Sequence, residues 1–283
     1  MMSIAILMAT YNSSEYIRPQ LDSLFSQTNQ DWLLYVRDDC STDNTINIIM
    51  EYQNKYPNRI VIINNKKESL RAYMNFIDLL KKVECKYYMF CDHDDVWLPN
   101  KIQISYERML KLESQSPNLP IVVHTDMKVV DQNLNVICDS FWKYSNLLPD
   151  HTKFEEMVLC NSANGCAMMF NDKAKTVALP NVSFATMHDM LVNQSVAASN
   201  GIISAIKIPA VLYRQHIDNV VGAKKRDLKY YIHKLKNIRI LFKDNVLCYK
   251  NANRIRPISI MSFLFTKIKI FIFKRTVRYE KYE

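Results

Sequence analysis

The chain has 283 residues, of which 48% are hydrophobic and 23% charged, so it can bury a large core and is not disordered by composition. Only 3 glycines are present, and the Gly-rich phosphate-binding motifs GxGxxG and GxxxxGK[ST] are absent, so any nucleotide must be held by other groups. The formal net charge of +9 comes from residues 224–283, where 17 Lys and Arg face 4 Asp and Glu.

Cysteine usage and the N-terminal residues indicate a cytoplasmic protein. The 7 cysteines include no CxxC pair, which is typical of reduced thiols and not of a disulfide framework. The opening MMSIAILMATYN has no basic leader and only a short apolar run, so we predict a first buried strand and no signal peptide. No uninterrupted apolar stretch of about 18 residues occurs, so no transmembrane helix is expected.

Strand-like and helix-like segments alternate in the first half of the chain. Four short apolar runs are typical of buried strands, namely residues 3–9, 32–38, 60–63 and 86–91. Four segments between and after them have apolar residues at helical spacing, namely residues 13–27, 41–56, 70–82 and 98–113. This alternation predicts an α/β fold with a doubly wound, mostly parallel sheet and helices on both faces.

The second half is less regular. We predict strands at 121–126 and 165–170, a helix at 187–200, and extended segments at 202–216 that are interrupted by Pro209. A change in composition near residues 222–224 divides the chain into a domain at 1–222 and a basic, amphipathic, helical extension at 223–283.

Polar residues follow three of the predicted strands and should line one crevice at the carboxyl edge of the sheet. They are Thr10-Tyr11-Asn12, Asp38-Asp39 and Asp92-His93-Asp94-Asp95. Asp92 and Asp94, at a strand end, can reach one hard cation such as Mg²⁺ or Mn²⁺. The structural alternatives are helix caps: Asp95 for the helix that follows it, and Asp38 and Asp39 for a helix beginning near Ser41.

Three interpretations of the acidic stretch remain open on the residues alone. FCDHDDVWLPNK fits DxDx[TV], the signature of haloacid-dehalogenase-type phosphatases, with Asp92 as nucleophile. That motif usually lies on the first strand, whereas three strand–helix units precede it here and no GDxxxD follows. A non-catalytic, membrane-bound scaffold with a degenerate nucleotide pocket is an alternative from another class. A metal-dependent transferase is the third.

Six motifs in order give the chain a resemblance to a known family. They are ILMATYNSSEYI, RDDCSTDNT, FCDHDDVWLPNK, NGCAMMF, MHD and YRQHIDNVVG, and they span roughly residues 3–222. In this order they resemble glycosyltransferase family 2, with the nearest likeness to bacterial rhamnosyltransferase-type, capsule and O-antigen members. The resemblance implies a GT-A fold, a divalent metal ion and inversion of the anomeric centre.

The resemblance also implies roles for individual residues. It places the nucleotide-sugar site at Thr10, Tyr11, Asn12, Glu15, Asp38, Asp39, Asn75, Asp92, His93 and Arg214. It places the metal, Mg²⁺ or Mn²⁺, at Asp92, Asp94 and His216, the catalytic base at Asp189, and the acceptor near Gly165 and His188. The chain departs from the family at Cys40 and near Ser69 and Leu70, where the family usually has glycine.

Asp189 opens a predicted helix, and a helix start favours the ionised carboxylate that proton abstraction needs. The alternative is that Asp189 only caps this helix, in which case the base is to be sought at Asp126 or Glu155. The expected reaction moves a sugar from a UDP- or dTDP-sugar to a saccharide acceptor, lipid-linked, in bacterial surface polysaccharide synthesis.

The basic extension has two nearly equal interpretations. Residues 258–283 combine cations with Phe, Leu and Ile and could lie on an anionic membrane surface, which would make the protein peripheral on the inner face of the cytoplasmic membrane. Alternatively the extension forms a helical cap that packs on the domain. Nucleic-acid binding through KKRDLK and KLKNIR is not expected, because residues 1–223 carry more acidic than basic side chains.

Overall fold

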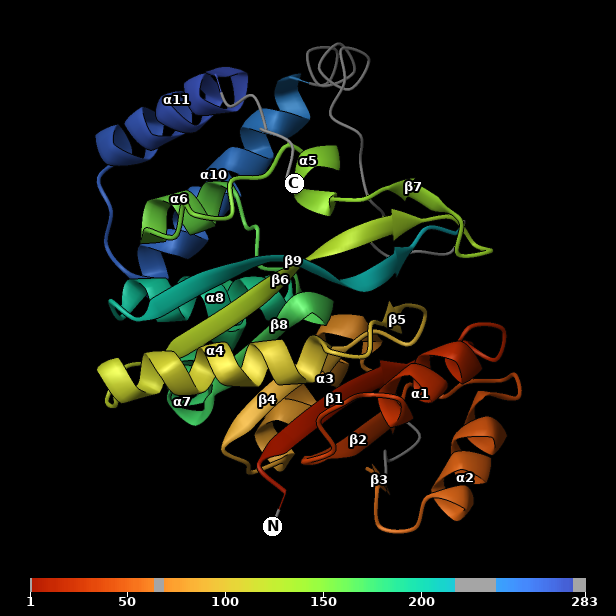
Figure 1. The fold of residues 1–283 in the computed structure, drawn as a ribbon. Helices are drawn as coiled ribbons and strands as arrows, with labels where there is room; N and C mark the ends of the chain where they lie inside the picture. Colours follow the sequence, from red (N-terminus) through yellow and green to blue (C-terminus); the bar gives the residue numbers. More distant parts are fainter. Residues whose placement is uncertain (1, 64–68, 217–237, 277–283) are drawn as a thin grey trace.

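The computed structural model describes residues 2–63, 69–216 and 238–276 (Figure 1). Within these ranges nine strands form one sheet in the order β3-β2-β1-β4-β8-β6-β9-β5, and β7 pairs with β6 outside this path. The strands are β1 (Ile4–Thr10), β2 (Trp32–Asp38), β3 (Ile60–Ile62), β4 (Tyr87–Cys91), β5 (Val96–Trp97), β6 (Ile121–Val130), β7 (Val136–Cys138), β8 (Met168–Asn171) and β9 (Ile202–Arg214).

The sheet is mostly parallel, as the sequence predicts. Strands β3, β2, β1 and β4 are parallel neighbours, and β6 and β9 are parallel to each other. Strand β8 lies antiparallel between β4 and β6, so β6 and β9 run in the direction of β1. The carboxyl ends of these strands therefore meet at one edge, where ligands bind in open α/β sheets.

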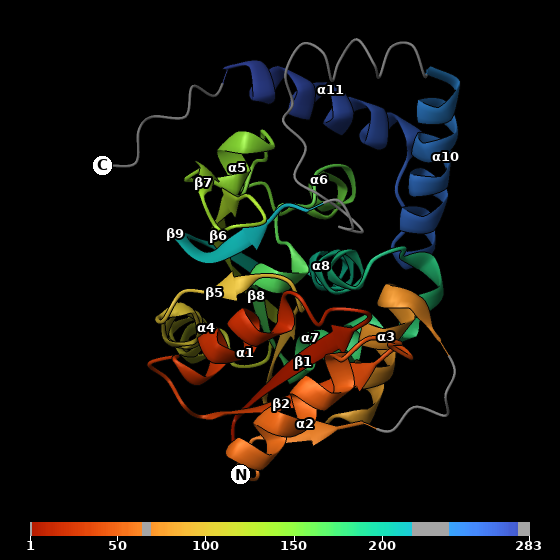
Figure 2. The same cartoon turned by 90° about the vertical axis from the view of Figure 1, so that its right-hand side faces the viewer.

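Helices cover both faces of the sheet. Side chains of β1 alternate between two apolar clusters, with Ile4, Ile6 and Met8 in one and Ala5 and Leu7 in the other. A strand buried on both faces needs a continuous apolar run, which is what residues 4–9 supply. Figure 2 shows α4 and α3 on opposite sides of the sheet.

Helices α1, α2 and α4 contribute to the first cluster, and α3, α7, α8, α10 and α11 contribute to the second. The helices in the first half are α1 (Ile17–Phe25), α2 (Thr45–Lys55), α3 (Arg71–Lys82) and α4 (Lys101–Gln115). Those in the second half are α5 (Phe141–Tyr144), α6 (Phe154–Leu159), α7 (Asp172–Ala178), α8 (His188–Ala198), α10 (Ile238–Ile255) and α11 (Ile260–Thr276), with 3-10 turns η1 (Gly165–Ala167) and η2 (Leu179–Phe184).

Two predicted boundaries in the second half are wrong. The expected strand at 165–170 begins only at Met168, because residues 165–167 form the 3-10 turn η1. The expected break at Pro209 is instead one continuous strand, β9, with a change of register. Ile206 pairs with Thr125 and Pro209 pairs with Asp126, so a bulge accommodates the proline that cannot donate to the ladder.

Helices α10 and α11 pack on the second half of the chain and lie far from β1–β3 (Figures 1 and 2). Phe263 is buried against Tyr249, and Lys269 pairs with Glu156 at 3.1 Å. The predicted boundary at 222–224, the KKRDLK run and most of KLKNIR lie outside the described residues. In the described part of the chain, no helix combines the length and apolar character needed to cross a membrane.

Candidate active site

Three strand ends meet at the carboxyl edge of the sheet, as predicted. Thr10 at the end of β1 pairs with Asp38 at the end of β2, and its hydroxyl donates to the Asp38 carboxylate at 2.9 Å. The backbone N–H and hydroxyl of Ser41 donate to the same carboxylate at 2.8 and 2.6 Å. His93, which follows β4, lies with Nδ1 3.2 Å from the carbonyl oxygen of Ala9. Asp38 thus holds the loop after β2 against β1.

The loop after β1 presents an exposed aromatic ring at this edge. The side-chain oxygen of Asn12 accepts from the Thr42 N–H at 2.8 Å, and the Asn12 N–H donates to the Ser41 hydroxyl at 2.8 Å. Tyr11 and Glu15, on either side of this anchor, are exposed. An anchored, exposed tyrosine can stack on a nucleobase, because both rings are flat and polarizable.

Asp39 caps a different helix from the one the sequence suggested. Its carboxylate accepts from the backbone N–H groups of Leu70 and Arg71 at 2.7 and 2.9 Å, and from the Ser69 hydroxyl at 2.8 Å. Burial would raise the pKa of Asp39, but these hydrogen bonds outweigh burial and lower it. Asp39 therefore fixes the start of α3, whereas α2 begins only at Thr45.

The acidic residues after β4 meet the end of β9. Nε2 of His216 lies 2.8 Å from Oδ2 of Asp94, although 122 residues separate them in the chain. Nε of Arg214 donates to the backbone oxygen of Asp94 at 2.7 Å. The ring of Tyr16 stacks on His216 with 4.5 Å between centroids, a contact that no sequence signal indicated. The predicted neighbourhood of Asp94, His216 and Arg214 is present.

Negative charge is concentrated at this point. Burial raises the pKa of Asp92 to about 7, with further contributions from the charges of Asp94 and Asp189. Burial acts in the same direction on Asp94, but the hydrogen bond with His216 and the charges of His93 and His216 together outweigh burial and lower the pKa of Asp94. Asp92 therefore lies within electrostatic range of both the predicted metal ligand and the predicted base. Carboxylates with one imidazole fit Mg²⁺ or Mn²⁺, which prefer oxygen ligands.

A second group of potential ligands lies deeper. Ligand atoms of Asp92, Asp95 and Cys166 all lie within 4.8 Å of one another. Asp95 is buried and accepts from the backbone N–H of Arg214 at 3.1 Å, so it anchors β9 and does not cap α4 as the sequence suggested. A thiol ligand suits softer metals, so this group fits Mg²⁺ less well than Asp94 and His216 do.

Lys101 is a buried cation behind the acidic residues, and the sequence gave it no role. Its ammonium donates to the carbonyl oxygen of Cys166 and lies 3.0 Å from the ring centroid of Trp97. Burial lowers the pKa of Lys101 to about 7, while nearby negative groups, Asp95 and Asp92 among them, act to raise it. Lys101 supplies positive charge beneath the carboxylates and ties the start of α4 to the Gly165–Ala167 turn.

Asp189 lies in the first turn of α8 and is held by a chain of amides. The side-chain amide of Asn161 donates to Oδ2 of Asp189 at 3.0 Å, and Asn193 donates in turn to Asn161 at 2.9 Å. The Met190 N–H donates to Oδ1 at 2.7 Å. Burial raises the pKa of Asp189 to about 6 against these hydrogen bonds, contrary to the expectation from the helix start alone. No sequence signal indicated Asn161.

Asp126 and Glu155, the alternative candidates for the catalytic base, have structural roles. Asp126 is buried and accepts from the Ser140 hydroxyl at 2.5 Å and the Trp142 N–H at 3.2 Å, which fixes the start of α5. Glu155 pairs with Arg256 at 3.2 Å and so holds the segment between α10 and α11. Of the three, Asp189 is the best-placed base, because its charge raises the pKa of Asp92 and it therefore lies near the predicted metal ligands.

Gly165 and His188, the predicted acceptor residues, fit together closely. A Cβ at Gly165 would lie 2.3 Å from Nε2 of His188, so the ring requires glycine there. The His188 ring packs on Phe76 and Phe90, with centroids 4.0 and 4.6 Å away, and burial lowers its pKa to about 3. His188 is therefore a neutral packing group beside Asp189. Asn75, next to Phe76, is buried, and its Oδ1 has no hydrogen-bond partner within the described residues.

This arrangement defines a class of protein: an α/β protein of GT-A-like fold, with acidic residues at the carboxyl edge of a mostly parallel sheet. Residues 5–177 match Glycosyl transferase family 2, and the chain belongs to this family. The protein is therefore an enzyme, and the glycosyltransferase interpretation replaces both the phosphatase and the non-catalytic scaffold.

Two relatives of known name match this chain, one over most of its length and one over a shorter part. The dTDP-rhamnosyl transferase RfbG of Shigella flexneri is 29% identical over 229 residues, which cover 76% of this chain and 74% of that protein. The UDP-Glc:alpha-D-GlcNAc-diphosphoundecaprenol beta-1,3-glucosyltransferase WfgD of Escherichia coli is 32% identical over 108 residues, or 38% of this chain and 41% of WfgD. The second match spans less than half of either protein.

Solved structures confirm the fold. TarS 1–349 of S. aureus in complex with UDP-GlcNAc has a TM-score of 0.57 at 19% identity and covers 94% of this chain and 76% of TarS 1–349. The mannosyltransferase PcManGT of Pyrobaculum calidifontis in complex with GDP-Man and Mn²⁺ has a TM-score of 0.51 at 13% identity, over 97% of this chain and 70% of that one. At these identities the likeness concerns the fold alone.

Proposed function

We propose that the protein is an inverting, metal-dependent glycosyltransferase that moves a sugar from a UDP- or dTDP-sugar to a saccharide acceptor. The observation that carries the proposal is the electrostatic proximity of Asp92, Asp94 and Asp189, with His216 bonded to Asp94. One set of side chains can thus neutralise a diphosphate through a cation, while a separate carboxylate faces the acceptor side.

The residues divide the work between leaving group and nucleophile. Asp94 and His216, with Asp92, would hold Mg²⁺ or Mn²⁺, which stabilises the charge of the departing nucleotide diphosphate. Asp189 takes the proton of the acceptor hydroxyl as its oxygen attacks the anomeric carbon opposite that diphosphate. A single displacement of this kind inverts the anomeric centre and needs no covalent enzyme intermediate.

The donor pocket in this proposal is the edge formed by the loops after β1, β2 and β4. It comprises Thr10, Tyr11, Asn12, Glu15, Asp38, Asp39, Asn75, His93 and Arg214, while Gly165 and His188 shape the acceptor side. Tyr11 is the exposed aromatic available to the base. Buried Thr10, Asp38 and Asp39 act through the loops that they fix, since their polar atoms bond to the protein. Buried Asn75 differs, because its Oδ1 has no hydrogen-bond partner within the described residues.

Relatives support the finer parts of the proposal. RfbG is named a dTDP-rhamnosyl transferase, WfgD acts on a diphosphoundecaprenol-linked sugar, and PcManGT was solved with Mn²⁺. By extension we propose a lipid-linked acceptor, a role in capsule or O-antigen synthesis, and a peripheral position on the inner face of the cytoplasmic membrane.

A panel of UDP- and dTDP-sugars tests the proposal, with nucleotide diphosphate release measured in Mg²⁺, in Mn²⁺ and in a chelator. Release should require the cation. Asp94→Asn should abolish metal-dependent nucleotide-diphosphate binding, whereas Asp139→Asn, at an exposed aspartate paired with Lys128, should leave it unchanged. Release of inorganic phosphate in place of nucleotide diphosphate, or equal behaviour of the two variants, would contradict the proposal.

A further inference from the structure

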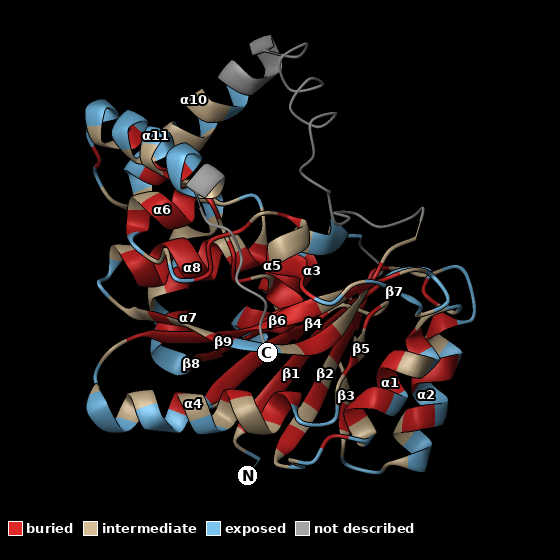
Figure 3. Cartoon of the chain, turned by 45° about the horizontal axis from the view of Figure 1, so that its top comes forward, coloured by how far each residue is buried: buried red, intermediate tan, exposed pale blue. Residues whose placement is uncertain are grey.

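Helix α11 exposes a stripe of large apolar side chains. Met261 and Phe265 are 73% and 70% exposed, and Ile260, Leu264 and Ile268 are also exposed. Their spacing of i, i+1, i+4, i+5 and i+8 places all five on one side of a helix. We call these five residues the outer face of α11. In Figure 3 the exposed parts of α11 contrast with the buried sheet below it.

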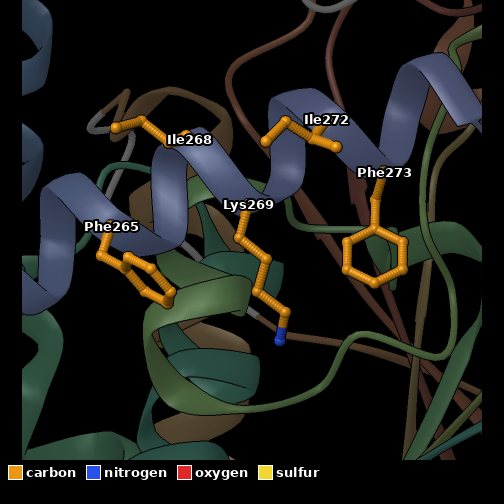
Figure 4. A pocket seen from close by; sticks show the side chains of 5 residues that line it. All are labelled: Phe265, Ile268, Lys269, Ile272 and Phe273. Carbon is orange, nitrogen blue, oxygen red and sulfur yellow. The ribbon is translucent and has the colours of Figure 1, made fainter.

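The opposite side of α11 already packs on the protein. Phe263 and Ile270 are buried there, and Lys269 pairs with Glu156 of α6. In Figure 4, Lys269 extends from the helix toward the body of the protein and Phe265 extends beside it, while Ile268 points to the other side. Phe265 therefore lies at the border between the attached side and the outer face, although it is 70% exposed. Phe265 and Ile268 belong to a pocket on the helix surface that Lys269 also lines. The apolar outer face is therefore additional to the residues that attach α11.

The charges around the outer face point to its occupant. Residues 260–276, IMSFLFTKIKIFIFKRT, contain no Asp or Glu. Lys269 is engaged by Glu156 on the attached side, and Lys267 and Lys274 precede and follow Ile270 on the same helix. Pairing two outer faces from two copies of the chain would bring these cations together with no acidic partner on either helix. An anionic lipid surface offers both an apolar layer for the stripe and negative headgroups for the flanking cations.

We propose that the outer face of α11 binds an anionic lipid bilayer, with the helix lying along the surface and its apolar side chains inserted at the level of the headgroups. The inner face keeps the helix attached to α6, so the two interpretations of the extension describe opposite sides of one helix.

This docking orients the active site, a consequence that rests on the proposed glycosyl transfer. Helix α6 carries Glu156, the partner of Lys269, and ends at Leu159, two residues before Asn161, which holds Asp189. Helices α6, α10 and α11 lie at one end of the molecule, and α8 lies between them and β1–β3 (Figures 1 and 2). Docking through α11 places the base nearer the bilayer than the donor strands, which suits an acceptor carried on a lipid.

Vesicle sedimentation of the full chain tests the docking. The vesicles contain phosphatidylcholine and phosphatidylglycerol in equal parts, or phosphatidylcholine alone. The variant Phe265→Ser/Ile268→Ser should lose affinity for anionic vesicles by about tenfold or more, because two apolar side chains no longer insert. The matched control is Val136→Ser/Ile137→Ser in β7, which removes two apolar side chains that are about half exposed, at 52% and 51%, and should bind as the unaltered chain does.

Binding should weaken as salt rises and should be lower on neutral vesicles, because screening removes the attraction of the cations. Equal affinity of the two double variants, or no sedimentation of the unaltered chain, would overturn the proposal. So would a solution mass that falls from dimer to monomer in the Phe265→Ser/Ile268→Ser variant without vesicle binding. Nucleotide diphosphate release without vesicles is measured in parallel, and its absence would count against the proposed function and not against docking.

Discussion

Asp189 combines two properties that oppose each other. Its burial favours the neutral acid, and the hydrogen bonds from Asn161 and Met190 favour the carboxylate. The result is a base stronger than an ordinary aspartate that is still ionised at neutral pH. Keeping a charge in this position costs stability, since the folded-state pKa of about 6 lies above the ordinary 3.8.

Asp189→Asn should therefore slow sugar transfer and at the same time stabilise the folded protein. Transfer should fall by a factor of about 10²–10⁴, the usual contribution of a general base. The folded state should gain up to about 3 kcal/mol at neutral pH, because the buried charge is gone. This gain should vanish at about pH 4, where the aspartate is protonated in the folded protein. Transfer assays and thermal unfolding at both pH values measure the two effects. Near-normal transfer would remove Asp189 from the mechanism.

The same raised pKa predicts the acid limb of the pH profile. A general base acts in its ionised form, so the rate of transfer should be full above about pH 7 and should fall as pH drops through about 6. An ordinary aspartate would keep the rate until about pH 4. The logarithm of the transfer rate at saturating donor, acceptor and metal, plotted against pH, distinguishes the two. A flat profile down to pH 5 would contradict the assignment.

We expect the buried ammonium of Lys101 to stabilise the folded protein. Lys101→Met keeps the side-chain length but removes the hydrogen bond to the Cys166 carbonyl oxygen and the positive charge near Asp92 and Asp95, so the fold should lose about 1–3 kcal/mol. Lys111→Met, an exposed position on the same helix, should cost well under about 1 kcal/mol. Chemical denaturation compares the two variants. Similar losses would show that Lys101 does not balance the acidic residues.

At the scale of elements, two loops form without the glycines usual in the family. Cys40 and Arg71 adopt φ angles of 66° and 60°, the left-handed conformation that costs a residue with a Cβ about 1–2 kcal/mol. Both flank the Asp39 network: Cys40 follows it directly, and the Arg71 N–H donates to it. The hydrogen bonds of Asp39 keep the backbone shape that glycine would otherwise favour.

Cys40→Gly should therefore stabilise the protein by about 0.5–1 kcal/mol, the relief of the left-handed strain less the extra chain entropy of glycine. Cys40→Val should destabilise it, because a β-branched residue fits this conformation poorly. Cys85→Gly provides the control, since Cys85 does not have a positive φ and should gain no stability. Thermal unfolding of the three variants measures these differences, and a loss for Cys40→Gly would contradict the strain argument.

The elements that sequence reasoning predicted well are those whose burial is set locally. Strands such as β1 and β4 are buried on both faces and read as continuous apolar runs. The misjudged segments depend on contacts from elsewhere. Pro209 is accommodated by the register of β9 on β6, and residues 165–167 turn because the Gly165 backbone must pass the His188 ring. Neither partner can be inferred from local periodicity.

In the active site too, features set by the local sequence could be predicted, and features set by distant contacts could not. Asp92 and Asp94 could be proposed from their position after a buried strand, but the pairing of Asp94 with His216 depended on the resemblance to the family. The sequence does not predict the roles of Lys101 and Asn161, because these roles depend on burial and on partners far away in the chain. A lysine in a helix start and an asparagine in a loop are ordinary in sequence. Only the fold shows that they face acidic groups.

At the scale of the whole molecule, the outer face of α11 should matter for some acceptors and not for others. Phe265→Ser/Ile268→Ser should lower transfer to a lipid-linked saccharide in anionic vesicles by about tenfold, because the enzyme loses its high local concentration at the surface. Transfer to a water-soluble saccharide should be unchanged, since α11 contributes no residue to the proposed site. The ratio of the two rates, compared with that of Val136→Ser/Ile137→Ser, measures the effect. An equal fall with both acceptors would mean that α11 supports the catalytic fold and does not recruit the enzyme to lipid.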